Sequence, residues 1–272
     1  MAGLDTRALA AEIYQAHNEG SPVTSRPSSR DESFDLSAAY AVENELARLR
    51  RSEGHATNGR KIGFTNKTLW PRLEIDNIVW GYTFDDTVFN FPGNQAKISL
   101  AKMVAPKLEP EIVFKMRQPL SEGVAPVDAL SAVEWIALGF EIVDCPYPNW
   151  RFRPADMVAA FGFHAALLIG EPRPLEDLPK LAEQLANFKL KLYKNGELAA
   201  EGAGSNVYDS PALCLGRLAQ TLSEQAEAEP LAAGEVVTSG TLTDATPVAA
   251  GQEWRAEVEG LDLPGFSVRF ES

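Results

Sequence analysis

The stretch Leu108-Glu-Pro-Glu-Ile-Val-Phe114 indicates a strand that carries charge into the interior of the protein. Glu109 and Glu111 stand two residues apart, so in a strand their side chains leave the same face. The apolar residues that follow, Ile112 to Phe114, lead the strand toward a core. Unpaired carboxylates are costly there unless a cation or hydrogen-bond donors compensate them. We therefore expect these two side chains to share one ligand.

A third carboxylate, Glu141, lies within the apolar run Trp135-Ile-Ala-Leu-Gly-Phe-Glu-Ile-Val143 and also needs a partner. Three such carboxylates can hold one hard cation, and oxygen ligands suit Mg²⁺ or Mn²⁺ better than Zn²⁺. Spacing alone leaves open, and even favours, another interpretation. In that interpretation Glu109 and Glu111 lie on an exposed strand edge and Glu141 pairs with an arginine. Asp144 is a rival ligand, but its odd offset from Glu141 places it on the opposite face of a strand.

Outward from this region, short β-like runs separated by turn residues extend from Arg60 to the C-terminus. We expect strands at 61–64, 87–91, 111–116, 136–143, 162–169, 188–193, 234–239, 253–258 and 267–270, and an Asn195-Gly196 hairpin turn. Helices are expected at 4–17, after the N-cap Asp35, and at 126–135, 175–187 and 210–225. The predicted fold class is α+β, with a small helical N-terminal part (1–59) and a β-rich domain (60–272).

Composition narrows the class of function. The chain has 272 residues with 38 acidic and 25 basic side chains, a formal charge of -13 that disfavours nucleic acid as a partner. An anionic substrate therefore needs a locally positive site. Cys145 and Cys214 have no metal-binding spacing, which indicates reduced thiols and a cytoplasmic protein. The first 20 residues show no secretion signal, and no apolar run is long enough to span a membrane.

Several motifs occur in a fixed order along the chain. They are Gly59-Arg-Lys-Ile-Gly-Phe-Thr65, Trp80-Gly-Tyr-Thr-Phe-Asp-Asp86, Leu108 to Phe114, Phe140-Glu-Ile-Val-Asp144 and Thr238-Ser-Gly-Thr241. Together they resemble the 2-keto-4-pentenoate hydratase and 4-oxalocrotonate decarboxylase family of the fumarylacetoacetate hydrolase superfamily. The resemblance runs from about Gly59 to the C-terminus. It implies a fumarylacetoacetate-hydrolase-like β-roll and homo-oligomers, dimers or higher.

The resemblance also assigns site residues. It implies a divalent metal, Mg or Mn, on Glu109, Glu111 and Glu141, and it places Lys61 in the active site. On sequence alone, Lys61 between two glycines is more typical of a snorkelling surface lysine. Near a cation, a partly buried lysine tends toward a lowered pKa. Asp86 is expected to orient Lys61 or to act as an acid or base, and the alternative is a turn aspartate.

Substrate contacts are expected from small and aromatic residues. Thr238, Ser239 and Gly240 would offer hydroxyl and backbone donors to a substrate carboxylate, and Ser205 matches a small-residue position of the family. Trp150 would wall the pocket, although the alternative for each of these is an ordinary turn or core residue. His164 is interpreted as a core histidine, with proton transfer as the alternative.

The resemblance implies a metal-dependent hydratase that acts on a small 2-oxo or 2-hydroxydienoic acid in the catabolism of aromatic or related compounds. Water would add to a 2-hydroxy-2,4-dienoate, through its 2-oxo-3-enoate tautomer, to give a 4-hydroxy-2-oxo acid. The alternatives are a decarboxylase of a 4-oxalocrotonate-like acid, a carbon-carbon bond hydrolase of acylpyruvate type, and a silent acid-binding partner subunit. Pro146, Ala160 and Phe161 depart from the family pattern. We expect them to make the substrate pocket more apolar and to favour a bulkier substrate.

Overall fold

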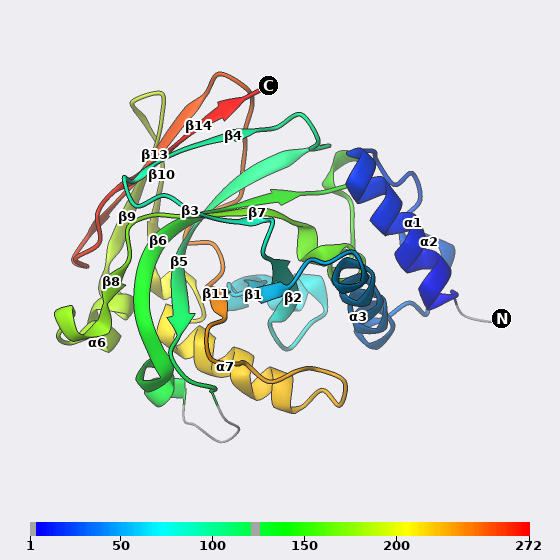
Figure 1. The fold of residues 1–272 in the computed structure, drawn as a ribbon, viewed down its shortest axis with the longest axis horizontal. Helices are drawn as coiled ribbons and strands as arrows, with labels where there is room; N and C mark the ends of the chain where they lie inside the picture. The colour runs from blue at the N-terminus through cyan, green and yellow to red at the C-terminus, as the bar shows by residue number, and fades with distance from the viewer. Residues whose placement is uncertain (1–3, 121–125) are drawn as a thin grey trace.

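The computed structural model describes residues 4–120 and 126–272. Three helices come first, α1 (Thr6–Glu19), α2 (Pro27–Arg30) and α3 (Leu36–Ser52), and Figure 1 shows them gathered on one side of the molecule. The predicted N-cap of α3 is confirmed, because the Asp35 carboxylate accepts a hydrogen bond of 2.9 Å from Ala38 N. The helices end before β1 begins at Thr57.

The larger sheet has nine strands and holds both glutamate segments. Its main path runs β2-β1-β11-β5-β6-β7-β3, with β12 paired to β5 and β8 paired to β6. In Figure 1 the long strands β5 and β6 are strongly curved. The bounds are β1 (Thr57–Gly63), β2 (Val79–Phe84), β3 (Val88–Asn90), β5 (Pro106–Met116), β6 (Val133–Asp144), β7 (His164–Ile169), β8 (Arg173–Pro174), β11 (Val236–Thr238) and β12 (Thr246–Pro247).

The second sheet has five strands in the order β10-β9-β13-β14-β4. The predicted hairpin turn is confirmed between β9 and β10, where Asn195 and Gly196 have φ angles of 50° and 85°. The bounds of its strands are β4 (Gln95–Ser99), β9 (Lys189–Lys194), β10 (Glu197–Ala203), β13 (Glu253–Glu259) and β14 (Phe266–Glu271).

The remaining helices are short, apart from α7, whose predicted N-cap Ser210 accepts from Ala212 N. The helix expected at 126–135 is wrong in kind, because a 3₁₀ helix ends at Ala132 and β6 begins at Val133. None of the helices in the described ranges is long and apolar enough to cross a membrane. The α-helices are α4 (Trp70–Leu73), α5 (Pro154–Val158), α6 (Leu181–Asn187) and α7 (Pro211–Ser223); 3₁₀ helices span Lys67–Leu69, Pro126–Ala132, Pro148–Trp150, Phe161–Phe163, Leu175–Asp177 and Gly204–Asn206.

The two faces of β5 have different surroundings. Leu108, Ile112 and Phe114 belong to the main core, which also holds apolar residues of the second sheet and of α7. Val113, on the other face, belongs to a small separate cluster. Because side chains alternate along a strand, Glu109 and Glu111 share the face of Val113. The alternation therefore keeps the carboxylates out of the main core. The buried members of the small cluster are Val88, Val113, Ala137, Leu167, Ile169 and Val236.

Helix α3 covers the free edge of β2, the strand at one end of the larger sheet. The Tyr40 hydroxyl accepts from Trp80 N at 3.1 Å, and Glu43 Oε1 accepts from Tyr82 N at 2.8 Å. Two side chains one helical turn apart thus meet two strand residues that point the same way. These bonds satisfy an edge that would otherwise expose unpaired backbone donors.

The buried Glu43 carboxylate leads to a prediction about how stability depends on pH. Burial raises the pKa of Glu43 from 4.5 to about 8, so the folded state binds a proton that the unfolded chain releases above pH 4.5. Wild-type stability should therefore fall relative to Glu43→Gln as pH rises from 5 to 8.5, by roughly 4 kcal/mol. Urea unfolding at several pH values measures the difference. The exposed Glu32→Gln is the control, and a gap between wild type and E43Q that does not change with pH would contradict the prediction.

Candidate metal centre

The register of β5 against β6 assembles the three predicted glutamates. Glu109 and Glu141 are direct cross-strand partners, while Glu111 lies two residues further along β5, opposite Gly139. Residues opposite or diagonal on one face of an antiparallel pair are within side-chain reach. One carboxylate oxygen from each residue lies within 4.8 Å of the other two. The structure thus brings Glu109, Glu111 and Glu141 together at one point.

This cluster is held in an environment that opposes charge. Glu111 and Glu141 are fully buried, whereas Glu109 is half-buried. Burial, reinforced by repulsion from Glu141 and Glu109, raises the pKa of Glu111 well above its ordinary value. Burial likewise raises the pKa of Glu109, although Lys61 counteracts it. Burial acts on Glu141 too, but attraction to Lys61 and the contacts with His164 outweigh it and lower that pKa.

The hydrogen bonds of the cluster are incomplete. Glu111 Oε2 accepts from Gly240 N at 2.7 Å, and Glu141 Oε1 lies 2.8 Å from His164 Nδ1. Glu141 Oε2 is 3.2 Å from Lys61 Nζ, at ion-pair distance without hydrogen-bond geometry. Glu111 Oε1 has no hydrogen-bond partner in the part of the chain that the structure describes. Because a buried oxygen without a donor is costly, these carboxylates fit a hard cation with oxygen ligands, such as Mg²⁺ or Mn²⁺.

Lys61 lies on β1 with 1% of its surface exposed, facing the carboxylates. Burial by itself lowers the pKa of its ammonium group, but attraction to Glu141, Glu109 and Glu111 outweighs burial and raises it. The lowered pKa expected beside a bound cation stays a prediction for the metal-bound site. Lys61 is a cation that neutralises part of a buried negative site.

A cavity of about 570 Å³ opens beside the cluster and contains Lys61, Glu109 and Gly240 in its lining. Trp150 forms part of its wall. The indole is fixed, because Trp150 Nε1 donates to Ala105 O at 3.1 Å. The Lys107 ammonium lies over the Trp150 ring, 3.9 Å from the ring centre, in a cation–π contact. Other apolar side chains of the lining include Leu69, Leu73, Phe152, Met157 and Phe163.

The other predicted contacts lie elsewhere or serve the protein itself. Ser239 Oγ accepts from Ile112 N at 3.1 Å, so this hydroxyl ties two chain segments together. Thr238 is fully buried, and the Gly240 N–H is already used by Glu111. Ser205 is exposed and is absent from the lining of the cavity. Asp86 pairs with Arg50 instead of Lys61 and lines a different cavity.

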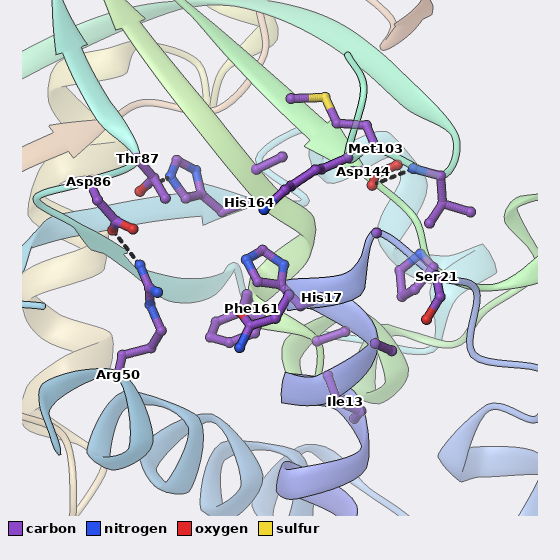
Figure 2. A pocket seen from close by; sticks show the side chains of 18 residues that line it. Ile13, His17, Ser21, Arg50, Asp86, Thr87, Met103, Asp144, Phe161 and His164 are labelled. Atoms are coloured by element: carbon purple, nitrogen blue, oxygen red, sulfur yellow. Dashed lines mark hydrogen bonds and ion pairs between the residues drawn. The ribbon is translucent and has the colours of Figure 1, made fainter. Parts of the chain in front are cut away.

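Figure 2 shows that second cavity, of about 250 Å³, on the side of α1 and α3. Pro146, Ala160 and Phe161 line it and are absent from the lining of the cavity beside the carboxylates, and their effect on the substrate pocket stays a prediction. His164 also lines it, while its Nδ1 contacts Glu141. Sequence reasoning missed this contact because nothing local shows how two strands pair across the sheet.

Comparison with known proteins agrees with this geometry. Residues 72–263 match the model of the fumarylacetoacetate (FAA) hydrolase C-terminal family. The chain belongs to this family. The β-roll expected from the sequence is thus confirmed as a fumarylacetoacetate-hydrolase-like fold with curled sheets.

The proteins that this chain resembles include hydratases and a decarboxylase. The chain is 33% identical to 2-hydroxyhexa-2,4-dienoate hydratase of Comamonas testosteroni over 82% of each protein. It is 29% identical to 2-keto-4-pentenoate hydratase of Paraburkholderia xenovorans (strain LB400), over 93% of this chain and 90% of the relative. The structure of 4-oxalocrotonate decarboxylase from Pseudomonas putida G7, complexed with magnesium and adipate, superposes with a TM-score of 0.88 at 25% identity, covering 97% of both chains.

A side chain at position 240 should disturb both the fold and the metal site. The φ of Gly240 is +91°, and a Cβ atom there would lie 2.5 Å from Thr65 Cγ2 and Oγ1. Gly240→Ala should lower stability by about 1–3 kcal/mol. It should also weaken Mn²⁺ binding, because the N–H moves away from Glu111. Gly251→Ala is the control, since Gly251 has a φ of +84° and open space around it.

Denaturation and Mn²⁺ titration monitored by electron paramagnetic resonance measure the two effects. Adding Thr65→Ala to the Gly240→Ala variant removes the two clashing atoms. The double variant should regain part of the lost stability and part of the lost Mn²⁺ affinity. Equal losses in G240A and G251A would show that backbone strain alone is responsible.

Proposed function

We propose that this protein is a metal-dependent hydratase of small 2-hydroxy-2,4-dienoic acids. The observation that carries the proposal is the convergence of Glu109, Glu111, Glu141 and Lys61 beside a cavity whose lining includes several apolar side chains. The reaction converts the dienoate to its 2-oxo-3-enoate tautomer and then adds water at C4, giving a 4-hydroxy-2-oxo acid. The two hydratases described above support this assignment.

The three glutamates would hold Mg²⁺ or Mn²⁺. When bound, such a cation supplies Lewis-acid chemistry by drawing electron density from the C1 carboxylate and C2 oxygen of the substrate. The magnesium complex of the structural relative supports a divalent cation.

The protein's own groups divide the remaining work. The Lys61 ammonium, 3.2 Å from Glu141 Oε2, offers positive charge to the substrate carboxylate and carries protons for transfer during the change of tautomer. The wall of Trp150, Phe152, Phe163 and Met157 matches an uncharged hydrocarbon tail. A neutral dienoate tail therefore suits this cavity.

A specific observation favours decarboxylation as the second candidate. Arg72 and Lys107 line the same cavity, and neither forms an ion pair with another residue of the described ranges. Such cations suit the second carboxylate of a 4-oxalocrotonate-like acid. The decarboxylase that superposes on this chain binds adipate, which is also a dicarboxylate.

Product analysis tests the proposal. The purified protein with Mg²⁺ or Mn²⁺ is incubated with 2-hydroxypenta-2,4-dienoate, 2-hydroxyhexa-2,4-dienoate and 4-oxalocrotonate. Mass spectrometry of the acids and CO₂ detection follow the products. We expect gain of one water by the dienoates. Release of CO₂ from 4-oxalocrotonate without hydration of either dienoate would favour the decarboxylase, and binding without turnover would favour the silent partner subunit.

We further propose that the protein acts in the cytoplasm as a homo-oligomer, a dimer or higher form. Cys145 and Cys214 are both free and buried, which supports a reducing compartment. Sedimentation equilibrium at several protein concentrations measures the subunit number, and a monomer at all of them would contradict the oligomer.

A further inference from the structure

An irregular pairing of β6 with β7 sets the direction of His164. Glu141 is opposite Leu167 and Ile142 is opposite Ala166, but Val143 is opposite His164, where a regular ladder would place Ala165. Because side chains alternate, a regular ladder would turn His164 to the face away from Glu141. The extra residue is a β-bulge, a feature that commonly redirects a side chain next to an active site. The bulge puts His164 on the face of the carboxylates.

Both ring nitrogens of His164 are then occupied. Nδ1 lies 2.8 Å from Glu141 Oε1, and Nε2 lies 3.0 Å from Thr87 Oγ1, as Figure 2 shows for Thr87. Thr87 is itself fixed, because its hydroxyl lies within hydrogen-bond distance of both Phe84 O and Phe84 N. With 4% of its surface exposed, the imidazole is packed as well as bonded. The ring cannot turn without breaking buried hydrogen bonds.

We propose that His164 is a positioning residue that holds Glu141 in the orientation needed to bind the metal, an inference that rests on the proposed metal-dependent function. The Nδ1–H donates to Glu141 Oε1, so the other oxygen stays directed toward Lys61 and the carboxylate cluster. Thr87 acts indirectly, because its contact with Nε2 fixes the His164 imidazole ring. Groups that orient a metal ligand typically change metal affinity about 10–100-fold when they are removed.

Variants at position 164 separate this role from simple packing. The amide nitrogen of asparagine lies near the position of Nδ1 and can still donate to Glu141. Glutamine reaches further, toward the position of Nε2 and Thr87. We therefore expect His164→Asn to keep most of the Mn²⁺ affinity and His164→Gln and His164→Leu to lose it.

Mn²⁺ binding measured by electron paramagnetic resonance tests the inference without reference to turnover. His164→Leu and His164→Gln should weaken Mn²⁺ binding about 10–100-fold, and Thr87→Val should weaken it less. His17→Gln is the matched control, because His17 lines the same second cavity without a hydrogen bond to Glu141. Circular dichroism confirms that each variant is folded.

The outcomes distinguish the inference from the proposed function. A wild-type protein that binds no Mn²⁺ overturns both. Tight Mn²⁺ binding by wild type together with equal affinity in the leucine, glutamine and asparagine variants overturns the role of His164 alone. If the leucine variant does not fold, the comparison of H164Q with H164N decides: weaker binding by H164Q supports the role, and equal binding overturns it.

Discussion

Replacing Glu111 with glutamine should abolish Mn²⁺ binding and yet make the metal-free protein more stable at pH 8. The carboxylate is fully buried, one of its oxygens lacks a donor among the described residues, and two other carboxylates repel it. Its raised pKa means that the folded state loses stability relative to the unfolded chain as pH rises above the ordinary range of a glutamate. Glutamine resembles the protonated acid and therefore avoids that loss of stability.

Activity should fall by at least about 10³-fold in the same variant, since a bound cation contributes several kcal/mol to catalysis. Denaturation of the metal-free proteins at pH 5 and pH 8, Mn²⁺ titration and initial rates measure the three effects. Glu201→Gln, at an exposed residue of the same cavity, is the control. A less stable metal-free E111Q that still binds Mn²⁺ would show that the carboxylate is structural.

Replacing Lys61 with methionine should lower both activity and the stability of the metal-free protein. Lys61 is 3.2 Å from Glu141 Oε2, and both side chains are buried. Removing one partner of a buried ion pair leaves the other charge uncompensated, which costs about 3–5 kcal/mol. Loss of a group that transfers protons and binds the substrate carboxylate should reduce the rate about 10²–10⁴-fold.

A double variant isolates the ion pair. Glu141→Gln combined with Lys61→Met removes both charges and should recover much of the stability lost in K61M, but none of the activity. Lys107→Met is the control, because Lys107 lines the same cavity outside the ion pair. Equal stability of wild type, K61M and the double variant would mean that the pair contributes nothing to folding.

Part of the site could be predicted from local sequence because local geometry is fixed by covalent spacing. The period of two along a strand places Glu109 and Glu111 on one face wherever the strand lies. Asp35 and Asn195-Gly196 were predicted for the same reason, since caps and hairpin turns depend on a few adjacent residues. The motif order supplied the family, and the family model confirmed it.

Other site residues depended on how distant strands pair. Glu141 meets Glu109 only through the register of β5 and β6, and His164 meets Glu141 only through a bulge in β7. Asp86 was expected beside Lys61, yet a salt bridge to Arg50 of α3 holds it at the other cavity.

The sequence by itself therefore determined the carboxylate pair, the strand-rich class and the family. The tertiary structure alone decided which side of the sheet each remaining residue faces. The physical reason is that shifting a strand by one residue leaves its sequence and propensity unchanged but turns every side chain to the opposite face.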